Sequence, residues 1–369
     1  MAEPLKNRYG PEIPRKISAM VLKVYPAFDS AGFIKDALQG YETLNLMQRG
    51  RKIAHTLKTH LPQNYEKAVG ILLRSLGERP LRTGDNPLSS FIYMPHTFFV
   101  ADYGLTSFEA SMEAQYELTK RFTAEFSIRA FLTHHEKQTL ARLKIWARDR
   151  DEHVRRLVSE GTRPRLPWAP RLPAFQKNPG PVLELLEMLK DDPALYVRRS
   201  VANNLNDIGK DHPDILAETC RYWLKNAPQE RQWLIRHGLR SAVKRGESGA
   251  LDVLGYGKAA RVVLQSIRIS PKNAVRGASV RIGVEIGNPE KNRQNVLADL
   301  CIHFVKANGK SSKKVFKLNT YTLLPGQSVA CGKKISLADL TTRKHYPGKH
   351  QVEILLNGKA RPLGTFVLT

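Results

Sequence analysis

The chain has 369 residues, 41% of them apolar and 25% charged, so it is long enough for two domains with separate cores. Fifty-nine Lys and Arg stand against thirty-four Asp and Glu, which gives a formal charge of +25 and a pI near 10. This excess favours a nucleic-acid partner, because cations that neutralise phosphates release bound counterions. No apolar run is long enough for a transmembrane helix and residues 1–16 lack a signal-peptide core, so no membrane partner is expected.

Cysteine usage and short motifs narrow the possible chemistry further. The three cysteines, Cys220, Cys301 and Cys331, are far apart and odd in number, which predicts reduced thiols and a cytoplasmic location. No Cys/His group has the sequence spacing of a metal site, so neither a metal nor a cofactor is expected. The motifs G-x-x-x-x-G-K-[ST], G-x-G-x-x-G, H-E-x-x-H and G-x-S-x-G are absent. ATP-driven, dinucleotide-dependent and zinc-protease chemistry are therefore disfavoured.

Residues 1–257 have the periodicity of helices joined by short loops. Early helices are expected near residues 13–25, 48–60, 64–76, 107–120 and 122–132. After them, D-E-H-V-R-R-L-V at 151–158 is echoed by D-P-A-L-Y-V-R-R-S-V at 192–201 and, more weakly, by I-R-H-G-L at 235–239. A unit that recurs about every 40 residues predicts HEAT-like repeats, in which stacked helix pairs form a solenoid.

One acidic residue stands out in the helix expected over 111–132. On a helical wheel Glu125 lies close to four apolar residues, namely Leu118, Phe122, Ile128 and Leu132. A carboxylate in such surroundings is partly desolvated, as functional acids often are. The alternative is a capped or hydrogen-bonded structural glutamate.

The repeats predict one buried face and one polar face. With Val197 at zero, the apolar residues Val197, Val201, Leu205 and Ile208 fall within about 80° of each other at 100° per residue. A polar sector lies at about 200–280°, and the preceding repeat contributes to the same sector. The polar face is expected to carry Arg156, Glu160, Arg199, Asn203 and Asp207.

Two interpretations of this polar face remain open. Arg156 and Glu160 are spaced i, i+4, and such a pair on a solvated face contributes only a few tenths of a kcal/mol. However, a face that served phosphates alone would avoid acids. Carboxylates set among arginines indicate that the face also handles positive charge, as a cationic reaction centre would require.

The segment T-R-P-R-L-P-W-A-P-R-L-P at 162–173 separates two repeats. Its prolines make it stiff, and Arg163 and Arg165 are suited to phosphates. Trp168 offers a flat apolar surface, and an aromatic contact with a base is worth about 1–3 kcal/mol. The alternative is a rigid linker in which Trp168 fills the core.

Residues 258–369 have a different periodicity, which places the domain boundary after residue 257. Seven β-rich runs separated by Pro, Gly and Asn turn signals predict an immunoglobulin-like sandwich. The strands are expected at 262–269, 279–286, 298–305, 314–318, 328–335, 350–356 and 363–368. Residues 261–369 hold nineteen Lys and Arg against five Asp and Glu, so this half carries +14 of the net charge. The charge favours a DNA-binding module over an appendage that only confers solubility.

The motifs R-x-x-x-E-G-x-R-P-R-L-P-W at 156–168 and V-R-R-S-V-A-N-N-L-N-D at 197–207 resemble the AlkC-type alkylpurine DNA glycosylases. These belong to the HEAT-like repeat superfamily that includes AlkD, and some carry a C-terminal immunoglobulin-like domain. The resemblance implies hydrolysis of the glycosidic bond of cationic alkylated bases, such as 3-methyladenine and 3-methylcytosine, in duplex DNA. It also implies a monofunctional, monomeric bacterial repair enzyme that works on nucleoid DNA without flipping the base.

Carried over by position, the resemblance assigns roles to particular side chains. Glu125 and Asp207 would stabilise the cationic sugar and position water, and Glu160 would support them. Trp168 would pack on the sugar of the lesion. The expected DNA-binding residues are Arg156, Arg163, Arg165, Arg199, Lys313 and Lys314. The competing hypotheses are a non-catalytic HEAT-repeat scaffold and an RNA-binding module, and the acids on the basic face favour the glycosylase.

Overall fold

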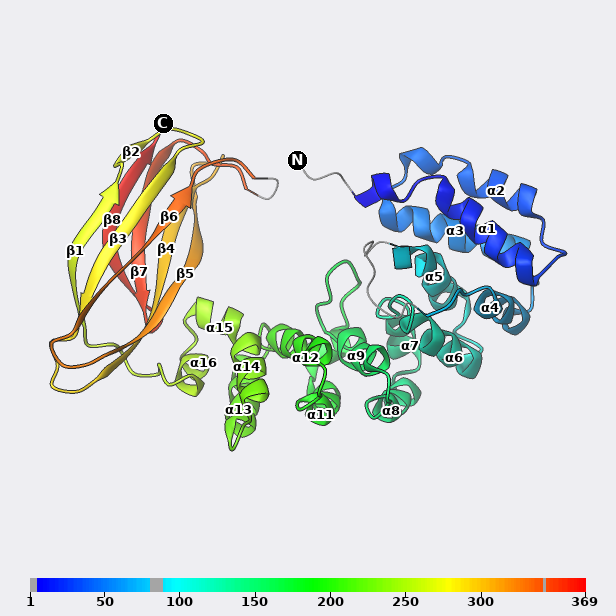
Figure 1. Ribbon diagram of the computed structural model, residues 1–369, viewed down its shortest axis with the longest axis horizontal. Helices are drawn as coiled ribbons and strands as arrows, with labels where there is room; N and C mark the ends of the chain where they lie inside the picture. The colour runs from blue at the N-terminus through cyan, green and yellow to red at the C-terminus, as the bar shows by residue number, and fades with distance from the viewer. Residues whose placement is uncertain (1–4, 80–88, 341–342) are drawn as a thin grey trace. The chain divides into compact units, whose positions relative to one another are not determined.

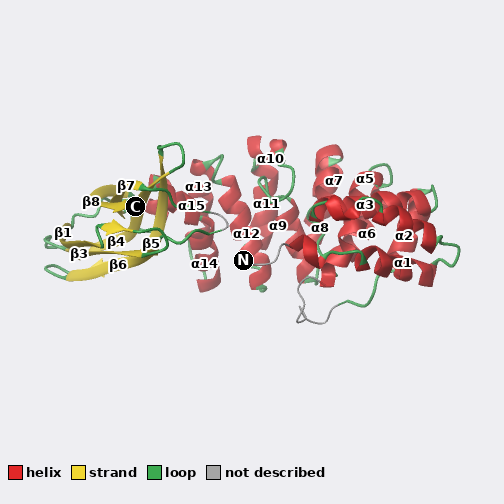
Figure 2. Ribbon diagram, turned by 90° about the horizontal axis from the view of Figure 1, so that it is seen from above, coloured by secondary structure: helices red, strands yellow, loops and turns green. Residues whose placement is uncertain are grey.

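The computed structural model describes residues 5–79, 89–340 and 343–369, and Figure 1 shows the helices and strands in chain order. The chain forms two compact units, Met1–Asp211 and His212–Thr369. Among the described residues the first unit is helical, and the second combines helices with strands. Figure 2 distinguishes helices from strands by colour. The predicted domain boundary after residue 257 lies between the last helix and the first long strand, whereas the boundary between the compact units comes earlier. Within the described ranges, no helix is long and apolar enough to cross a bilayer.

The first unit consists of short helices in the HEAT-like pattern. They are α1 (Glu12–Val24), α2 (Ser30–Leu38), α3 (Leu46–His60), α4 (Tyr65–Arg74), α5 (Met94–Tyr103), α6 (Phe108–Thr119), α7 (Ile128–His134), α8 (Glu136–Trp146), α9 (Glu152–Gly161), α10 (Pro173–Lys177), α11 (Gly180–Leu189) and α12 (Leu195–Ile208). Short 3₁₀ helices span Leu5–Arg8, Tyr41–Thr43 and Ser89–Tyr93. The second unit begins with α13 (Pro213–Leu224), α14 (Gln229–Gly238), α15 (Arg240–Arg245) and α16 (Ser248–Val253).

The helix expected over 122–132 is wrong in its first half. α6 ends at Thr119 and α7 begins at Ile128, so Glu125 lies in the connection between them rather than on a helix. A local hydrogen bond explains the difference. The Thr123 hydroxyl oxygen accepts from the Glu125 backbone N–H at 3.3 Å, and such side-chain bonds compete with helical ones.

The repeated V-R-R sequence has a structural cause. Arg155 in α9 donates through Nη1 to the carbonyl oxygens six and five residues before it, at 2.8 and 3.0 Å. Arg198 in α12 does the same at 2.6 and 2.8 Å. Each arginine thus ties its helix to the preceding loop by satisfying two carbonyl oxygens there. The first arginine of the motif is structural in both repeats, and the second is left for other contacts.

Helices α9 and α12 pack side by side in one layer, and α8 and α11 lie in the layer beneath (Figure 1). The apolar stripe predicted for α12 is confirmed, because Val197, Val201, Leu205 and Ile208 are all 0% exposed. Gly161 ends α9 where α7 comes close. A Cβ there would lie 2.5 Å from Cγ2 of Ile128, so only glycine fits without displacing α7.

The strands form a two-sheet immunoglobulin-like sandwich, as predicted. They are β1 (Val263–Ser270), β2 (Asn273–Ala274), β3 (Ser279–Gly287), β4 (Gln294–Val305), β5 (Ser311–Leu323), β6 (Ser328–Ser336), β7 (Gly348–Leu356) and β8 (Lys359–Leu368). All seven predicted strands are present, and the two-residue β2 is additional. One sheet has the order β1-β3-β6 and the other β2-β8-β7-β4-β5. Alternate residues of β4, among them Leu300, Ile302 and Phe304, face the core between the sheets.

Candidate active site

A cavity of about 410 Å³ opens in the first unit, bordered by α9, the start of α12 and the 120–127 connection. The cavity is lined by both aromatic and charged side chains. Its aromatic lining comprises Phe91, Phe122, Phe126, Trp168 and Tyr196, and its charged lining comprises Glu125, Arg156, Glu160 and Arg163. This combination of apolar surface and convergent charges is typical of a ligand site.

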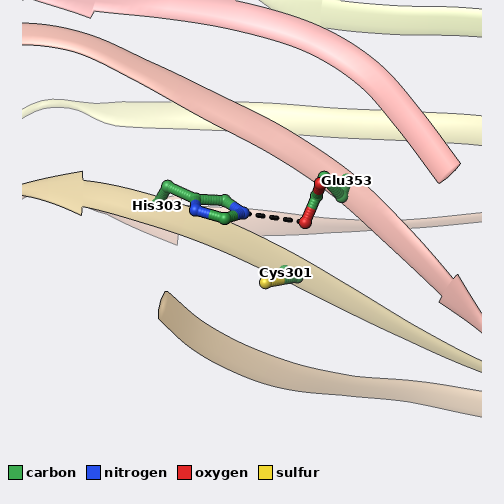
Figure 3. Close-up of side chains that lie close together, drawn as sticks. All are labelled: Cys301, His303 and Glu353. Atoms are coloured by element: carbon green, nitrogen blue, oxygen red, sulfur yellow. Dashed lines mark hydrogen bonds and ion pairs between the residues drawn. The ribbon is translucent and has the colours of Figure 1, made fainter. Parts of the chain in front are cut away.

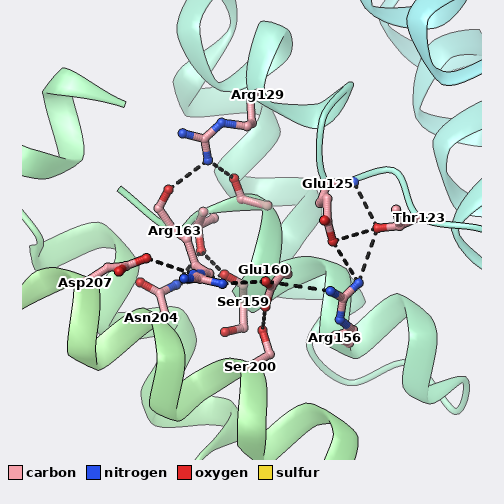
Figure 4. Close-up of polar contacts among 12 residues, drawn as sticks. Thr123, Glu125, Arg129, Arg156, Ser159, Glu160, Arg163, Ser200, Asn204 and Asp207 are labelled. Carbon is pink, nitrogen blue, oxygen red and sulfur yellow. Dashed lines mark hydrogen bonds and ion pairs between the residues drawn. The ribbon is translucent and has the colours of Figure 1, made fainter. Parts of the chain in front are cut away.

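Arg156 contacts Glu125, Thr123 and Glu160 (Figure 4). Its Nη1 lies 2.8 Å from Oε2 of Glu125 and donates to the Thr123 hydroxyl at 3.2 Å. Its guanidinium carbon lies 5.0 Å from the centre of the Tyr196 ring, a cation–π distance. Burial alone would lower the pKa of Arg156, but the neighbouring Glu125 and Glu160 carboxylates hold it above its ordinary value. Arg156 is therefore a fixed cation that orients Glu125.

Glu160 is shared between three partners, which lie on α9, on α12 and in the 162–173 segment between them. Its Oε1 accepts from Nη1 of Arg163 at 2.7 Å and lies 3.7 Å from Nη2 of Arg156. Its Oε2 accepts from the hydroxyl of Ser200 at 2.5 Å. The residue is only 6% exposed, so the solvated i, i+4 pair considered as an alternative does not describe it. Glu160 joins two arginines inside the protein.

Asp207 departs from the predicted location. The wheel placed it on an open polar face, but it is 1% exposed and does not line the cavity. Its Oδ2 accepts from Nε of Arg163 at 2.8 Å, and its Oδ1 from Nζ of Lys210 at 2.7 Å. The cause is tertiary, because Arg163 comes from the 162–173 segment and covers this end of α12. Burial would lower the pKa of Arg163, and the Glu160 and Asp207 carboxylates raise it.

The two arginines and three carboxylates therefore form one alternating row. The order is Glu125, Arg156, Glu160, Arg163 and Asp207, drawn from the 120–127 connection, α9, the 162–173 segment and α12 (Figure 4). Buried charges of this kind are stable only when paired and hydrogen-bonded. Moving either arginine of the row would leave the carboxylates on both sides of it with one cation fewer.

Trp168 lies beside this row on the 162–173 segment. Its backbone is in the left-handed region, with φ 65°, and the residue is 68% exposed. The alternative that Trp168 fills the core is therefore wrong. Left-handed backbone is costly for a bulky residue and persists where surrounding contacts impose it. An exposed indole that lines a cavity is suited to stack on a flat ligand.

Arg129 of α7 supplies those contacts. Its guanidinium donates to the carbonyl oxygens of Gly161 at 3.1 Å, Arg163 at 2.8 Å and Pro170 at 2.5 Å. It thereby clamps both ends of the segment that carries Trp168. Burial, and then the nearby Arg163 cation, lower the pKa of Arg129 to about 10. It still carries its charge near neutral pH, where a cation strengthens bonds to carbonyl groups.

Comparisons with known proteins identify the family. Residues 263–369 match the family described as the C-terminal Ig-like domain of the uncharacterised protein YhaZ. The uncharacterized protein YhaZ of Bacillus subtilis is 36% identical over 97% of both chains. The alkylpurine DNA glycosylase AlkC of Pseudomonas fluorescens, solved bound to DNA containing an abasic-site analogue, is 37% identical over the whole of both chains, with a TM-score of 0.91. The chain belongs to the AlkC family. The predicted resemblance and fold class are confirmed.

The other predicted residues of this AlkC-family chain lie outside the row. Arg165 forms an ion pair with Asp211, with Nε 2.8 Å from Oδ2, and Arg199 is exposed on α12. Lys313 and Lys314 are exposed on β5 in the second unit. A basic hollow in the same unit is lined by Lys306, Lys310, Arg343 and Lys344, among others.

Sequence reasoning missed four residues of the AlkC-family site. Tyr196 falls at about 260° on the wheel used above, inside the polar sector, so the pattern could have identified it. Ser200 lies just outside that sector, next to Arg199. Thr123 and Arg129 gave no comparable signal, because their partners are about 30–40 residues away in the chain. In the second unit Cys301, His303 and Glu353 lie close enough together to hold a metal ion, a grouping that their sequence spacing does not indicate.

Proposed function

We propose that the protein is a DNA glycosylase that hydrolyses the N-glycosidic bond of cationic alkylated bases in duplex DNA. The observation that carries this proposal is the full-length match to AlkC bound to an abasic-site analogue, which mimics the product of such a reaction. The row of carboxylates beside an exposed tryptophan supports it, because that chemistry needs negative charge near a sugar. The proposed substrates are 3-methyladenine and 3-methylcytosine, whose ring carries positive charge.

The chemistry begins with a good leaving group. A cationic base departs as a neutral molecule when the C1′–N bond breaks, and the electron deficiency moves to the deoxyribose as an oxocarbenium-like centre. Glu125, Glu160 and Asp207 stabilise that centre electrostatically. Water then adds to C1′ and gives up one proton, leaving an abasic site. A carboxylate orients this water, and Trp168 packs against the sugar.

In this scheme Arg156 and Arg163 bind carboxylates in the free protein and phosphates in the DNA complex. In the free protein Arg156 and Arg163 are neutralised by carboxylates, at N–O distances of 2.7–2.8 Å for their shortest contacts. Backbone phosphates of bound DNA compete for the same guanidiniums. Phosphate binding would draw Arg156 and Arg163 away and turn the carboxylates toward the reacting sugar. The five residues of the row carry one net negative charge at rest, three carboxylates against two arginines, and the carboxylates are less compensated once the arginines turn to phosphates.

We infer that the enzyme is monofunctional and acts as a monomer. Enzymes that also cut the strand use an amine to form a Schiff base with the sugar. None of the described residues that line the cavity is a lysine, so water is the proposed nucleophile. Phosphate contacts beyond the cavity are assigned to Arg165, Arg199, Lys313 and Lys314.

The base is proposed to remain in the DNA helix rather than flip into the cavity, because the charged residues that line the cavity are assigned to the sugar and the phosphate backbone. A cavity of about 410 Å³ would also admit an extrahelical nucleotide, so the alternative is physically open. A fluorescent base analogue next to the lesion distinguishes them. Fluorescence that stays quenched on binding supports an unflipped base, and a rise with each turnover supports flipping.

One experiment tests the activity itself. The protein is incubated with duplex containing 3-methyladenine, and free base is measured chromatographically, with alkali cleavage reporting abasic sites in parallel. Release of base together with alkali-labile sites is the expected result. Tight duplex binding without base release would favour the non-catalytic scaffold, and a preference for RNA would favour the RNA-binding module.

A further inference from the structure

Three side chains of the sandwich converge on the outer face of the five-stranded sheet (Figure 3). Cys301 and His303 come from β4, and Glu353 comes from β7. Nε2 of His303 lies 2.7 Å from Oε2 of Glu353. The possible ligand atoms of all three residues lie within 4.8 Å of one another.

Strand geometry accounts for the convergence. Residues i and i+2 of a strand project from the same face, so Cys301 and His303 point the same way. Glu353 is the direct register partner of Cys301 in the antiparallel pair β4–β7. Directly opposed residues have Cβ atoms about 4.5–5.5 Å apart, which allows both side chains to reach one point. Two ligands on one strand and a third on its neighbour therefore form a preorganised triangle.

The donor set indicates which ion the triangle suits. One sulfur, one imidazole nitrogen and one carboxylate oxygen are the three ligand types of protein zinc sites. Ligand atoms around tetrahedral zinc are about 3.3–3.7 Å apart, given metal–ligand distances of about 2.0–2.3 Å. The His303–Glu353 pair, at 2.7 Å, would have to lengthen and the wider contacts, up to 4.8 Å, to shorten, which small side-chain rotations would allow. A thiolate and a carboxylate also balance the 2+ charge, which matters in a domain with many cations.

The three proposed ligands differ in how much of their side chains is exposed to solvent. Cys301 is 1% exposed, while His303 and Glu353 keep part of their side chains open to solvent. The sulfur would therefore bind the ion from the buried side, and the solvent-exposed side leaves room for a water molecule as fourth ligand. Zinc sites with three protein ligands keep one position open, whereas structural sites are closed by four protein ligands.

We propose that Cys301, His303 and Glu353 form a zinc site that ties β4 to β7 in the immunoglobulin-like domain. The site lies in the second unit and is independent of the proposed glycosylase activity. Bound zinc stabilises the folded sandwich, because an ion that binds only the native state shifts the unfolding equilibrium.

The test uses the full chain without a histidine tag, after removal of metals with a chelator. Zinc is titrated against a chromophoric chelator, and cobalt(II) is added separately as a spectroscopic probe. One ion per chain is expected, together with a higher Tm and the absorption bands of tetrahedral cobalt bound to a thiolate. His303→Gln and Glu353→Gln should each weaken zinc binding at least about 100-fold, beyond the upper range for outer-shell residues.

Cysteine variants separate this site from non-specific thiol binding. Cys301→Ser should abolish the thiolate–cobalt band, while Cys331→Ser on β6 should leave it and the zinc affinity unchanged. Cys301 is buried, so its variant counts as evidence only if its circular dichroism spectrum shows native folding. If it does not fold, the zinc affinities of the His303 and Glu353 variants decide whether the site exists. Absence of zinc binding at micromolar concentration, or affinity unchanged in both His303→Gln and Glu353→Gln, would overturn the proposal.

Discussion

At the scale of single residues, the site depends on which carboxylates can meet a developing cation. Glu125 reaches the cavity, whereas Asp207 reaches the row through Arg163. The two acids therefore differ in what their loss should do to the free protein. Asp207 is fully buried between two cations, and breaking a buried pair commonly costs about 3–5 kcal/mol of stability. Glu125 has more solvent access and a smaller structural role.

We expect Glu125→Gln and Asp207→Asn each to lower single-turnover excision of 3-methyladenine by at least about 100-fold, the scale of one preorganised electrostatic group. Duplex affinity should be retained, because removing an acid removes no phosphate contact. Thermal unfolding is measured alongside, and only Asp207→Asn should show a marked fall in Tm. A variant with wild-type single-turnover rates would remove that acid from the mechanism.

At the scale of elements, the sequence predicts helices and strands correctly where interactions between neighbouring residues determine them. The helices of the repeats follow from apolar periodicity, and the strands follow from alternation between turn signals. The sequence predicts the buried stripe of α12 residue by residue.

The sequence does not predict the 120–127 connection, where a helix is expected instead. A threonine side chain there competes with helical hydrogen bonding. The burial of Asp207 could not be predicted from the sequence either, because it depends on Arg163, which lies 44 residues away in the chain. The pairing that joins Cys301 to Glu353 is likewise set by sheet register.

The 162–173 segment gives a prediction at this scale. Arg129→Met keeps the length of the side chain but removes every donor to the carbonyl groups of Gly161, Arg163 and Pro170. Buried carbonyls left without partners cost about 1–3 kcal/mol each, so the segment should loosen while the helices remain folded. Excision should fall at least about tenfold.

Limited trypsinolysis with mass spectrometry measures the loosening directly. Cleavage after Arg165 and Arg171 should become faster in Arg129→Met than in the wild type. Arg142→Met on α8 is the control, because its ion pair with Glu109 lies at the surface and touches no part of the segment. Unchanged cleavage in Arg129→Met, with normal excision, would show that the clamp is dispensable.

At the scale of the whole molecule, positive charge is concentrated in the sandwich. Lys313 and Lys314 lie in the same unit as the basic hollow formed around Lys306 and Arg343. Each phosphate contact contributes about 0.9 to the slope of log K against log salt for duplex DNA. The double variant Lys313→Gln/Lys314→Gln should therefore reduce that slope by up to about 2 and weaken binding evenly across sequences.

The measurement is fluorescence anisotropy of labelled duplex at several salt concentrations. Lys137→Gln removes one exposed lysine of α8 in the other unit and is the control for losing a positive charge outside the sandwich. An identical slope for the double variant and the wild type would mean that these two lysines do not contact DNA.

The last prediction follows from where the driving force for bond cleavage originates. If the base is not held in a pocket, little of its edge is read, and selectivity depends on the lability of the glycosidic bond. Bases methylated at N3 carry their own positive charge and leave without help. Neutral lesions such as uracil and hypoxanthine need a proton on departure, which a general acid must supply.

The ionisable groups of the row are poorly suited to supply that proton. Arg156 is held in its charged form by its acidic neighbours, and Glu160 accepts hydrogen bonds on both oxygens. Cationic 3-methyl bases should therefore be released at least about 100-fold faster than uracil or hypoxanthine from the same duplex context, a ratio on the scale of one missing general acid. Time courses with matched oligonucleotides measure it. Rapid release of either neutral base would reject electrostatic stabilisation without acid catalysis, even if the protein proved to be a glycosylase.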